Sequence, residues 1–240
     1  LTDMLIQMQD RGPDSAGVAL YRDPVGDGWV KLCVTASGAS ADWQQIADQL
    51  ASAFGHAHYA VHGSHAVIRV AGAFKAVRDW LATHHPQVRI VSAGSAIEIY
   101  KDMGLPATVA ESFGFRDFSG THALGHTRMA TESAVTTAHS HPFSTGLDLC
   151  LVHNGSLSNH NRLREELRRL GIVFQTDNDS EVAAGYLTDR LSDGASLNNA
   201  LGDAVGALDG FYTFAVGTHD GFAVLRDPIA CKHAVLAETD

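Results

Sequence analysis

The dipeptide Asn154-Gly155 follows an apolar run over residues 149–153 and precedes a helical stretch. The run predicts a buried strand that ends in an amide and a glycine. An Asn side-chain amide and a neighbouring glycine N–H at a strand end can both donate hydrogen bonds to the oxyanion that forms when an amide is hydrolysed. The ordinary interpretation is a hairpin turn, for which Asn-Gly is the commonest dipeptide.

Three more polar stretches lie at the ends of expected elements: residues 11–17 (RGPDSAG), 125–133 (GHTRMATES) and 176–181 (TDNDSE). Arg128 can bind a carboxylate through two parallel hydrogen bonds. Asp179, or its rival Asp177, can bind an ammonium group. Each stretch taken alone also has an ordinary interpretation: a Pro-Asp turn at Asp14, an exposed strand residue at Arg128, and a helix cap at Asp179 or Ser180.

Hydrophobic periodicity predicts the elements that must position these side chains. We expect a helix up to Gly12, strands over 15–21 and 122–131, two short helical patterns within 95–119, helices over 161–170 and 179–191, and a hairpin over 211–227. Residues 29–94 alternate in the order β-α-β-β-α-β, which is typical of a ferredoxin-like subdomain. The sequence therefore predicts an α+β protein with antiparallel sheets and a subdomain inserted at residues 29–94.

The composition is that of a globular protein and argues against several classes. The 240 residues are 45% hydrophobic, and the net charge of −10 with scattered basic residues disfavours a nucleic-acid partner. No apolar run reaches the roughly 18 to 20 residues of a membrane span, and no signal-peptide pattern opens the chain. Cys33, Cys150 and Cys231 are widely spaced, which predicts reduced thiols. We expect a cytoplasmic protein with no membrane partner.

Arg128, Asn154-Gly155 and Asp179 in this order, with RGPDSAG upstream, resemble the class II glutamine amidotransferases. GHTRMATESAVTTAHSHPFSTG, CLVHNGSLSNHN and IEIYKDMGLP look closest to the amidotransferase subunit of N-methylglutamate synthase, a glutamate-synthase-like assembly. The resemblance spans residues 1–240 apart from the insertion. It implies a four-layer αββα sandwich of the N-terminal-nucleophile hydrolase type, which cleaves glutamine to glutamate and releases ammonia to a partner synthase.

The resemblance also implies a role for each matching residue. Asn154 and Gly155 would be the catalytic oxyanion donors. Arg128, Thr131 and Asp179 would bind the glutamine substrate, with Arg128 on its α-carboxylate and Asp179 on its α-ammonium group.

Four neighbouring residues would support this pocket: Arg11, Asp14, Met129 and His153. Met129 and Glu132 stand where sugar-phosphate members of the family carry an aromatic residue and a histidine. Both departures favour the glutamate-synthase-like branch over an acceptor of the sugar-phosphate kind.

The nucleophile that the family uses has no counterpart in this sequence. It is an N-terminal cysteine well upstream of the RGPDSAG-type motif, whereas Cys33, Cys150 and Cys231 are all preceded by chain. The sequence begins with Leu1 rather than Met, and we expect both of its ends to be truncated. We therefore expect a longer native polypeptide whose N-terminal Cys lies upstream of Leu1.

Two alternatives from other classes remain. Without a nucleophile, the domain would be a glutamine-sensing or structural subunit of such a complex. In a metal-dependent hydrolase, four histidines would bind Zn²⁺ with Glu132 as base: His122, His126, His139 and His141. The glutamine amidotransferase that the resemblance implies needs no metal or cofactor in this chain. Flavin and iron–sulfur groups would belong to partner subunits, among them a flavin-containing synthase subunit.

Overall fold

Two three-stranded antiparallel sheets form the centre of the computed structural model, which describes residues 1–36, 41–130 and 134–238. The first sheet has the order β6-β1-β7, with β1 (Ser15–Tyr21) between β6 (Ile97–Met103) and β7 (His122–Arg128). The second has the order β10-β9-β8 and consists of β8 (Cys150–Leu157), β9 (Gly210–Thr218) and β10 (Gly221–Arg226). The strand expected over 15–21 and the C-terminal hairpin are thus confirmed, and the strand expected over 122–131 is present but ends at Arg128.

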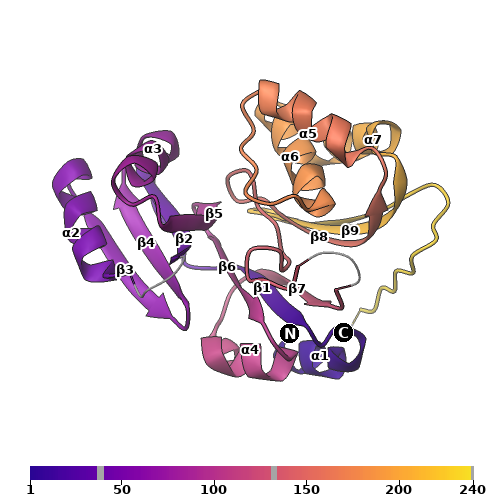
Figure 1. Cartoon of the computed structure of the whole chain (residues 1–240), viewed down its shortest axis with the longest axis horizontal. Helices are drawn as coiled ribbons and strands as arrows, with labels where there is room; N and C mark the ends of the chain where they lie inside the picture. The colour runs from indigo at the N-terminus through magenta and orange to yellow at the C-terminus, as the bar shows by residue number, and fades with distance from the viewer. Residues whose placement is uncertain (37–40, 131–133, 239–240) are drawn as a thin grey trace.

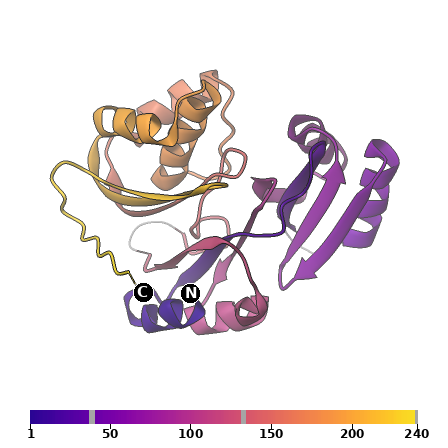
Figure 2. The same cartoon turned by 180° about the vertical axis from the view of Figure 1, so that it is seen from behind.

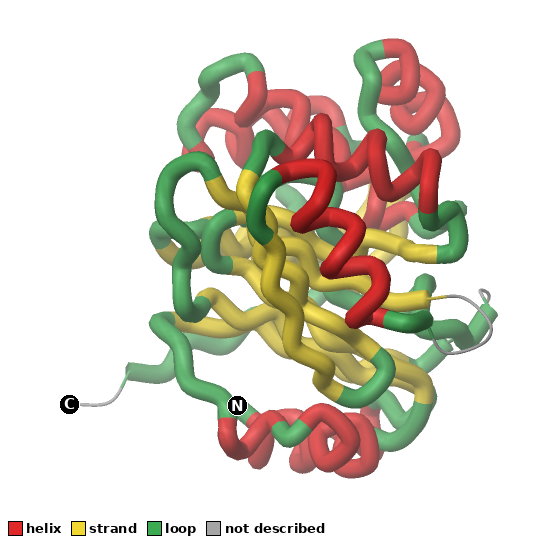
Figure 3. Tube along the Cα trace, turned by 90° about the vertical axis from the view of Figure 1, so that its left-hand side faces the viewer, coloured by secondary structure: helices red, strands yellow, loops and turns green. Residues whose placement is uncertain are grey.

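Helices cover the outer face of each sheet, which gives four layers (Figures 1 and 3). The β6-β1-β7 sheet is covered by α1 (Thr2–Gln7) and α4 (Pro106–Phe113), and the β10-β9-β8 sheet by α5 (His160–Arg169), α6 (Asp179–Ser192) and α7 (Leu197–Ala207). Apolar side chains of the second sheet and its three helices form one continuous core, in which Leu151, Val182 and Phe214 are buried. The predicted αββα sandwich is confirmed.

Residues 29–94 form a separate four-stranded sheet that lies beside the sandwich (Figures 1 and 2). Its elements are β2 (Trp29–Ala36), α2 (Trp43–Phe54), β3 (Ala57–His62), β4 (His65–Ala71), α3 (Phe74–His84) and β5 (Val88–Gly94). The antiparallel strands have the order β3-β4-β2-β5, so the expected β-α-β-β-α-β arrangement is confirmed. The subdomain has its own core, because the four aromatic residues of its helices pack against it: Trp43, Phe54, Phe74 and Trp80.

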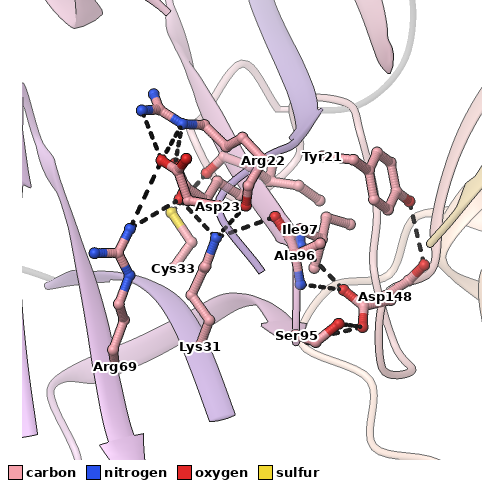
Figure 4. A network of polar contacts seen from close by, with 12 residues as sticks. Tyr21, Arg22, Asp23, Lys31, Cys33, Arg69, Ser95, Ala96, Ile97 and Asp148 are labelled. Atoms are coloured by element: carbon pink, nitrogen blue, oxygen red, sulfur yellow. Dashed lines mark hydrogen bonds and ion pairs between the residues drawn. The ribbon is translucent and has the colours of Figure 1, made fainter. Parts of the chain in front are cut away.

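A buried ion-pair network joins the subdomain to the sandwich (Figure 4). The Lys31 ammonium of β2 lies 3.0 Å from Glu98 Oε1 of β6, and both side chains are almost fully buried. Nearby, the Asp148 carboxylate accepts hydrogen bonds from the Ser95, Ala96 and Ile97 amides at 2.7 to 3.0 Å. Buried charges of this kind need such partners, so the contacts specify how the subdomain is placed.

Three sequence-based expectations were wrong. Of residues 95–119, where two short helical patterns were expected, 106–113 and 115–117 are helical, but 97–103 are a strand because they pair with every residue of β1 from Ser15 to Tyr21. β8 does not end at Asn154-Gly155 but continues to Leu157, paired with β9 throughout. The cap of α6 is Asn178, whose side chain accepts the Ser180 N–H, instead of Asp179 or Ser180.

No described helix is long and apolar enough to cross a bilayer.

Candidate functional site

Asn154 and Gly155 lie inside strand β8 and are exposed, while His153 before them and Leu157 after them are buried. Gly155 has φ +148°, and a Cβ atom at this position would come within 2.0 Å of the Phe211 carbonyl oxygen on β9. Glycine is therefore required by the close approach of the neighbouring strand. Among the described residues, no hydrogen bond engages the Asn154 side chain, so its amide remains available to a ligand.

Arg128 is the last residue of β7, is 8% exposed, and lies opposite Ser15 of β1. Its Nη1 lies 3.3 Å from the Ala134 carbonyl oxygen. Burial lowers the pKa of Arg128, and the Asp14 carboxylate opposes that shift. Asp14 also holds the following backbone, because its Oδ2 accepts the Ala130 N–H at 2.8 Å and its own N–H donates to the Arg128 carbonyl at 3.0 Å. Asp14 thus fixes the end of β7 in place.

Asp179 begins α6 and reaches back to β8. Its Oδ2 accepts the Leu157 N–H at 2.9 Å, and its Oδ1 lies 3.7 Å from His153 Nδ1. Burial raises the pKa of Asp179, but the interactions with His153 and the Leu157 amide outweigh it and leave the pKa below its usual range. The carboxylate is therefore ionised near neutral pH and can attract a cation.

Three histidines, the buried His141 and His153 and the partly buried His126, connect these parts and are called here the histidine cluster. The His126 and His141 rings stack at 4.2 Å. Ser180 Oγ lies 3.0 Å from His141 Nε2 and 2.9 Å from His153 Nδ1, so one hydroxyl joins two of the rings. Nothing among the described residues hydrogen-bonds His153 Nε2, which lies 2.9 Å from the position of a Cβ on Gly155.

The environment keeps part of the histidine cluster neutral. Burial lowers the pKa of His126 to about 4, although its ring is hydrogen-bonded to the His153 backbone. Burial, with the charges of its histidine neighbours, Lys101 and Arg128, holds the pKa of His141 well below the usual value. The charge of Arg128 helps to lower the pKa of His126 and His141, and His153 Nδ1 lies 3.7 Å from Asp179 Oδ1, so the cluster interacts with both charged residues predicted to bind substrate.

Sequence reasoning missed His126, His141 and Ser180 as parts of this site. It assigned His126 and His141 to a zinc site instead. Among the described residues, no group of three or more His, Cys, Asp or Glu side chains is arranged to hold a metal ion. His122 stacks on Tyr21, and His139 pairs with Asp177 at 2.8 Å, so these two histidines lie away from the stacked pair.

The remaining predicted residues are less closely joined. Arg11 ends the short 3₁₀ helix Gln9–Arg11 and is exposed, and Met129 is 55% exposed beside Arg128. Thr131 lies outside the described residues, as does Glu132. Gly12 packs against the backbone of β7, because a Cβ there would lie 2.5 Å from the Thr127 carbonyl carbon. The RGPDSAG stretch therefore supports β7 through its backbone and through Asp14.

Cys33 and Cys150 are buried free thiols in β2 and β8. Burial raises the pKa of both, to about 11 for Cys150. A thiol with a raised pKa is protonated near neutral pH and is a poor nucleophile. Cys231 is exposed and lies beyond β10.

Comparison with known proteins agrees with the fold and the order of these motifs. The sequence model of a family described as "Glutamine amidotransferase domain" matches residues 126–240. "Glutamine amidotransferase-like protein GlxB" of Rhizobium meliloti (strain 1021) is 55% identical over this whole chain and 80% of its own length. Glutamine–fructose-6-phosphate aminotransferase of Xanthomonas campestris pv. campestris is 44% identical over 100 residues, which cover 41% of this chain and 16% of that enzyme.

One solved structure shows the same fold at low sequence identity. "Structure of the allosteric regulatory enzyme of purine biosynthesis" superposes with a TM-score of 0.56 at 20% identity. The match covers 93% of this chain and 33% of the other, so this chain spans about a third of that enzyme. The likeness concerns the arrangement of sheets and helices described above.

Proposed function

The chain belongs to the class II glutamine amidotransferases, and we propose that it hydrolyses the side-chain amide of glutamine to glutamate and ammonia for a partner synthase. The observation that carries the proposal is the exposed Asn154-Gly155 segment of β8, which directly follows His153 of the histidine cluster. Arg128 and Asp179 flank that cluster with opposite charges. Glutamine has an amide to be cleaved and two charged groups at its other end, so this set of side chains matches it.

In the proposed reaction, Asn154 and Gly155 stabilise the tetrahedral intermediate. Attack on the amide carbon places negative charge on the carbonyl oxygen, and the Asn154 side-chain N–H and the Gly155 backbone N–H donate to it. The backbone that carries both donors is fixed in advance, since both residues belong to a strand paired with β9 from Cys150 to Leu157. Preorganised donors need no reorientation as the charge develops, which lowers the barrier.

Arg128 and Asp179 would hold the amino-acid end of glutamine. The guanidinium of Arg128 binds the α-carboxylate through two parallel N–H donors, and the ionised Asp179 binds the α-ammonium group. Thr131 completes the contact to substrate, and Arg11, Asp14, Met129 and His153 support the pocket. Asp14 has the clearest supporting contacts, because it binds the backbone on both sides of Met129.

The nucleophile would be an N-terminal cysteine upstream of Leu1. Its α-amine takes the thiol proton, the thiolate attacks the amide carbon, and ammonia leaves with a proton as a thioester forms. Water then hydrolyses the thioester to glutamate and restores the thiol. Both groups titrate close to neutral pH, the amine at about 7.7 to 8.0 and the thiol at about 8.5, so the proton transfer is easy. The raised pKa values of Cys33 and Cys150 support an upstream nucleophile.

The partner proposed is a synthase of the glutamate synthase or N-methylglutamate synthase type, with a flavin-containing subunit. The similarity of residues 97–106, 125–146 and 150–161 to such a subunit supports this choice. Flavin and iron–sulfur groups would reside in the partner subunits, and the assembly would be cytoplasmic.

A second candidate is a nucleophile-free subunit that binds glutamine without cleaving it. The buried state of Cys33 and Cys150 favours this candidate if the mature chain carries no N-terminal cysteine. Intact-mass measurement and N-terminal sequencing of the polypeptide isolated from its source separate the two. An N-terminal Cys together with glutaminase activity that disappears in its Cys→Ala variant supports the proposed enzyme. Any other N-terminal residue, with glutamine binding but no turnover, places the sensing subunit first.

A further inference from the structure

A cavity lies where the inserted subdomain meets the sandwich and is lined by residues of β5 and β6, which Figure 1 shows near each other. Its volume is about 530 Å³, within the range of sites that bind small molecules. The subdomain contributes residues 89–91 of β5, and the sandwich contributes Lys101, the 136–139 turn and Glu181. The walls include none of Arg128, Asn154, Gly155 and Asp179, so this cavity is distinct from the proposed glutamine site.

Arg89 supplies a cation to this cavity that nothing in the described part of the chain neutralises. Its guanidinium lines the wall and forms no hydrogen bond or ion pair with another described residue. Arg89 pairs with Thr35 of β2, and the register of β2 and β5 shifts at Cys33/Val34, so Val91 is an extra residue opposite the shift. Such a bulge re-aims the side chains beside it and is common at functional sites.

The other charged groups of the cavity are already engaged. Lys101 donates to the carbonyl oxygens of Ala138, Ser140 and Pro142 at 3.3, 2.7 and 3.0 Å, which uses all three of its hydrogens. Glu181 accepts the Gln175 and Thr176 amides, both at 2.8 Å. Among the described residues of the wall, a ligand therefore meets one available cation, Arg89, in the presence of the buried Glu181 carboxylate.

We propose that this cavity binds a small organic monocarboxylate, whose carboxylate group pairs with Arg89. A planar carboxylate matches the guanidinium fork in two parallel hydrogen bonds. A dianion such as a phosphate ester fits worse, because Lys101 has no hydrogen left to donate and Glu181 repels the second charge. Met103 and Phe143 line the sandwich side and provide apolar contact for the body of the ligand. The hydroxyl groups of Thr35, Ser64 and Thr137 also line the cavity, and because each already donates a hydrogen bond within the protein, they can offer only acceptor oxygens to a ligand.

The cavity is also connected to the proposed glutamine site through the 134–139 segment. Arg128 Nη1 donates to the Ala134 carbonyl at one end of this segment, and His139 Nδ1 lies 2.7 Å from Thr136 Oγ1 at the other. Asp102 accepts hydrogen bonds from Thr137 at 2.6 Å and from Ser64 of the subdomain at 3.0 Å. A ligand between Arg89 and Thr136 would therefore fix the segment that contacts Arg128. This coupling rests on the proposed glutaminase function, whereas the binding itself does not.

Binding is tested by calorimetry and ligand-observed NMR with benzoate and hexanoate as probes, each compared with its amide, benzamide and hexanamide. We expect saturable carboxylate binding with a Kd of about 1 mM or tighter, and at least about tenfold weaker binding of the amides. Arg89→Gln should weaken carboxylate binding at least about tenfold, while the matched surface variant Arg162→Gln should bind as the parent does. Circular dichroism and thermal melts establish that both variants are folded.

Three results would overturn the proposal. These are absence of saturable binding of either carboxylate up to about 10 mM, equal affinity for carboxylate and amide, and tighter binding of phenyl phosphate than of benzoate.

The coupling between this cavity and the glutamine site is measured separately, by kinetics on the full-length polypeptide. A saturating carboxylate should change the KM for glutamine in the parent and not in Arg89→Gln. If glutaminase activity is absent altogether, the proposed function fails, while the calorimetric result still decides the binding site.

Discussion

Asp179 Oδ2 accepts the Leu157 N–H at 2.9 Å, so the first turn of α6 is tied to β8 two residues beyond Gly155. The carboxylate proposed to hold the α-ammonium group and the donors proposed to hold the oxyanion therefore belong to one rigid unit. In the proposed complex, this contact would help to set the distance between the two ends of glutamine, since it joins the two elements that hold them. Rigid placement of this kind is what positions a substrate for attack.

Replacing Asp179 with Asn should raise the KM for glutamine by about 10- to 100-fold, because a hydrogen bond to a charged group is worth roughly 1.5 to 3 kcal/mol. Asp177→Asn is the matched control. Its carboxylate is 87% exposed and pairs with His139, so the KM should stay within about twofold of the parent value. Steady-state kinetics on the full-length polypeptide decides between them. A larger effect at Asp177 would move the ammonium-binding role to that residue.

Arg128→Lys should raise the KM for glutamine at least about tenfold with little loss of stability, since a lysine keeps the charge but loses one of two parallel hydrogen bonds. Arg162→Lys, on the exposed face of α5, should leave the KM unchanged. Urea unfolding of both variants controls for damage to the fold. An unaltered KM in Arg128→Lys would remove this arginine from the substrate site.

Asn154→Ala in the full-length polypeptide should lower kcat for glutamine hydrolysis by about 10² to 10³ and leave the KM nearly unchanged, because the lost hydrogen bond forms mainly in the transition state. The exposed Asn199→Ala on α7 provides the control. Normal turnover in a variant that merely unfolds at a lower temperature would show that Asn154 stabilises the strand and takes no part in catalysis.

The sequence was sufficient for the elements whose patterns are local. The 3.6-residue and two-residue periods located α2, α3 and the four strands of the subdomain, and these features depend only on neighbouring residues. The sequence was insufficient where pairing between distant segments determines the secondary structure. Residues 97–103 form a strand because β1 pairs along their whole length, and β8 passes through Asn154-Gly155 because β9 accommodates φ +148° at the glycine.

The same distinction applies to the candidate site, where residues in local motifs could be predicted and residues brought together by packing could not. Three of the four short motifs contain Arg128, Asn154, Gly155 and Asp179, and each of these residues was predicted because it lies in a distinctive stretch of sequence. The histidine cluster escaped notice, since His126, His141 and His153 come from three segments that only the packing of two sheets brings together. Of these, His153 adjoins a motif and was assigned a supporting role. His126 lies within the 125–133 stretch, but it and His141 were assigned to the alternative zinc site, because the enrichment in histidine was their most evident signal.

Gly155→Ala should destabilise the protein by about 3 kcal/mol or more, since a Cβ atom would clash with the Phe211 carbonyl and the backbone is strained for any other residue. Gly171→Ala is the control for positive φ alone. It has φ +94° with open space around it, so its cost should be about 1 to 2 kcal/mol. Urea denaturation measures both. Equal costs would show that the close approach of β9 relaxes at little expense.

The histidine cluster should make the protein lose stability as the pH falls from about 6.5 to 4.5. The pKa of His126 is lowered to about 4 in the folded state, and that of His141 is well below its usual value. The unfolded chain therefore binds more protons in this window, so stability present above pH 6.5 is lost as the pH falls toward the folded pKa. For His126 alone the full loss is about 3 kcal/mol.

Urea unfolding at several pH values tests this origin. His141→Gln removes one of the suppressed titrations and the repulsion between stacked rings, so the loss between pH 6.5 and 4.5 should shrink by about 1 kcal/mol or more. His233→Gln, in the exposed segment after β10, should not change it. His65 of β4, whose pKa burial also lowers to about 4, contributes a separate share that His65→Gln would remove. Carboxylates with lowered pKa, such as Asp148, act only below this window. A pH dependence identical in His141→Gln and the parent would mean that the cluster already takes up its protons without strain, and the buried, neutral state argued for it would be wrong.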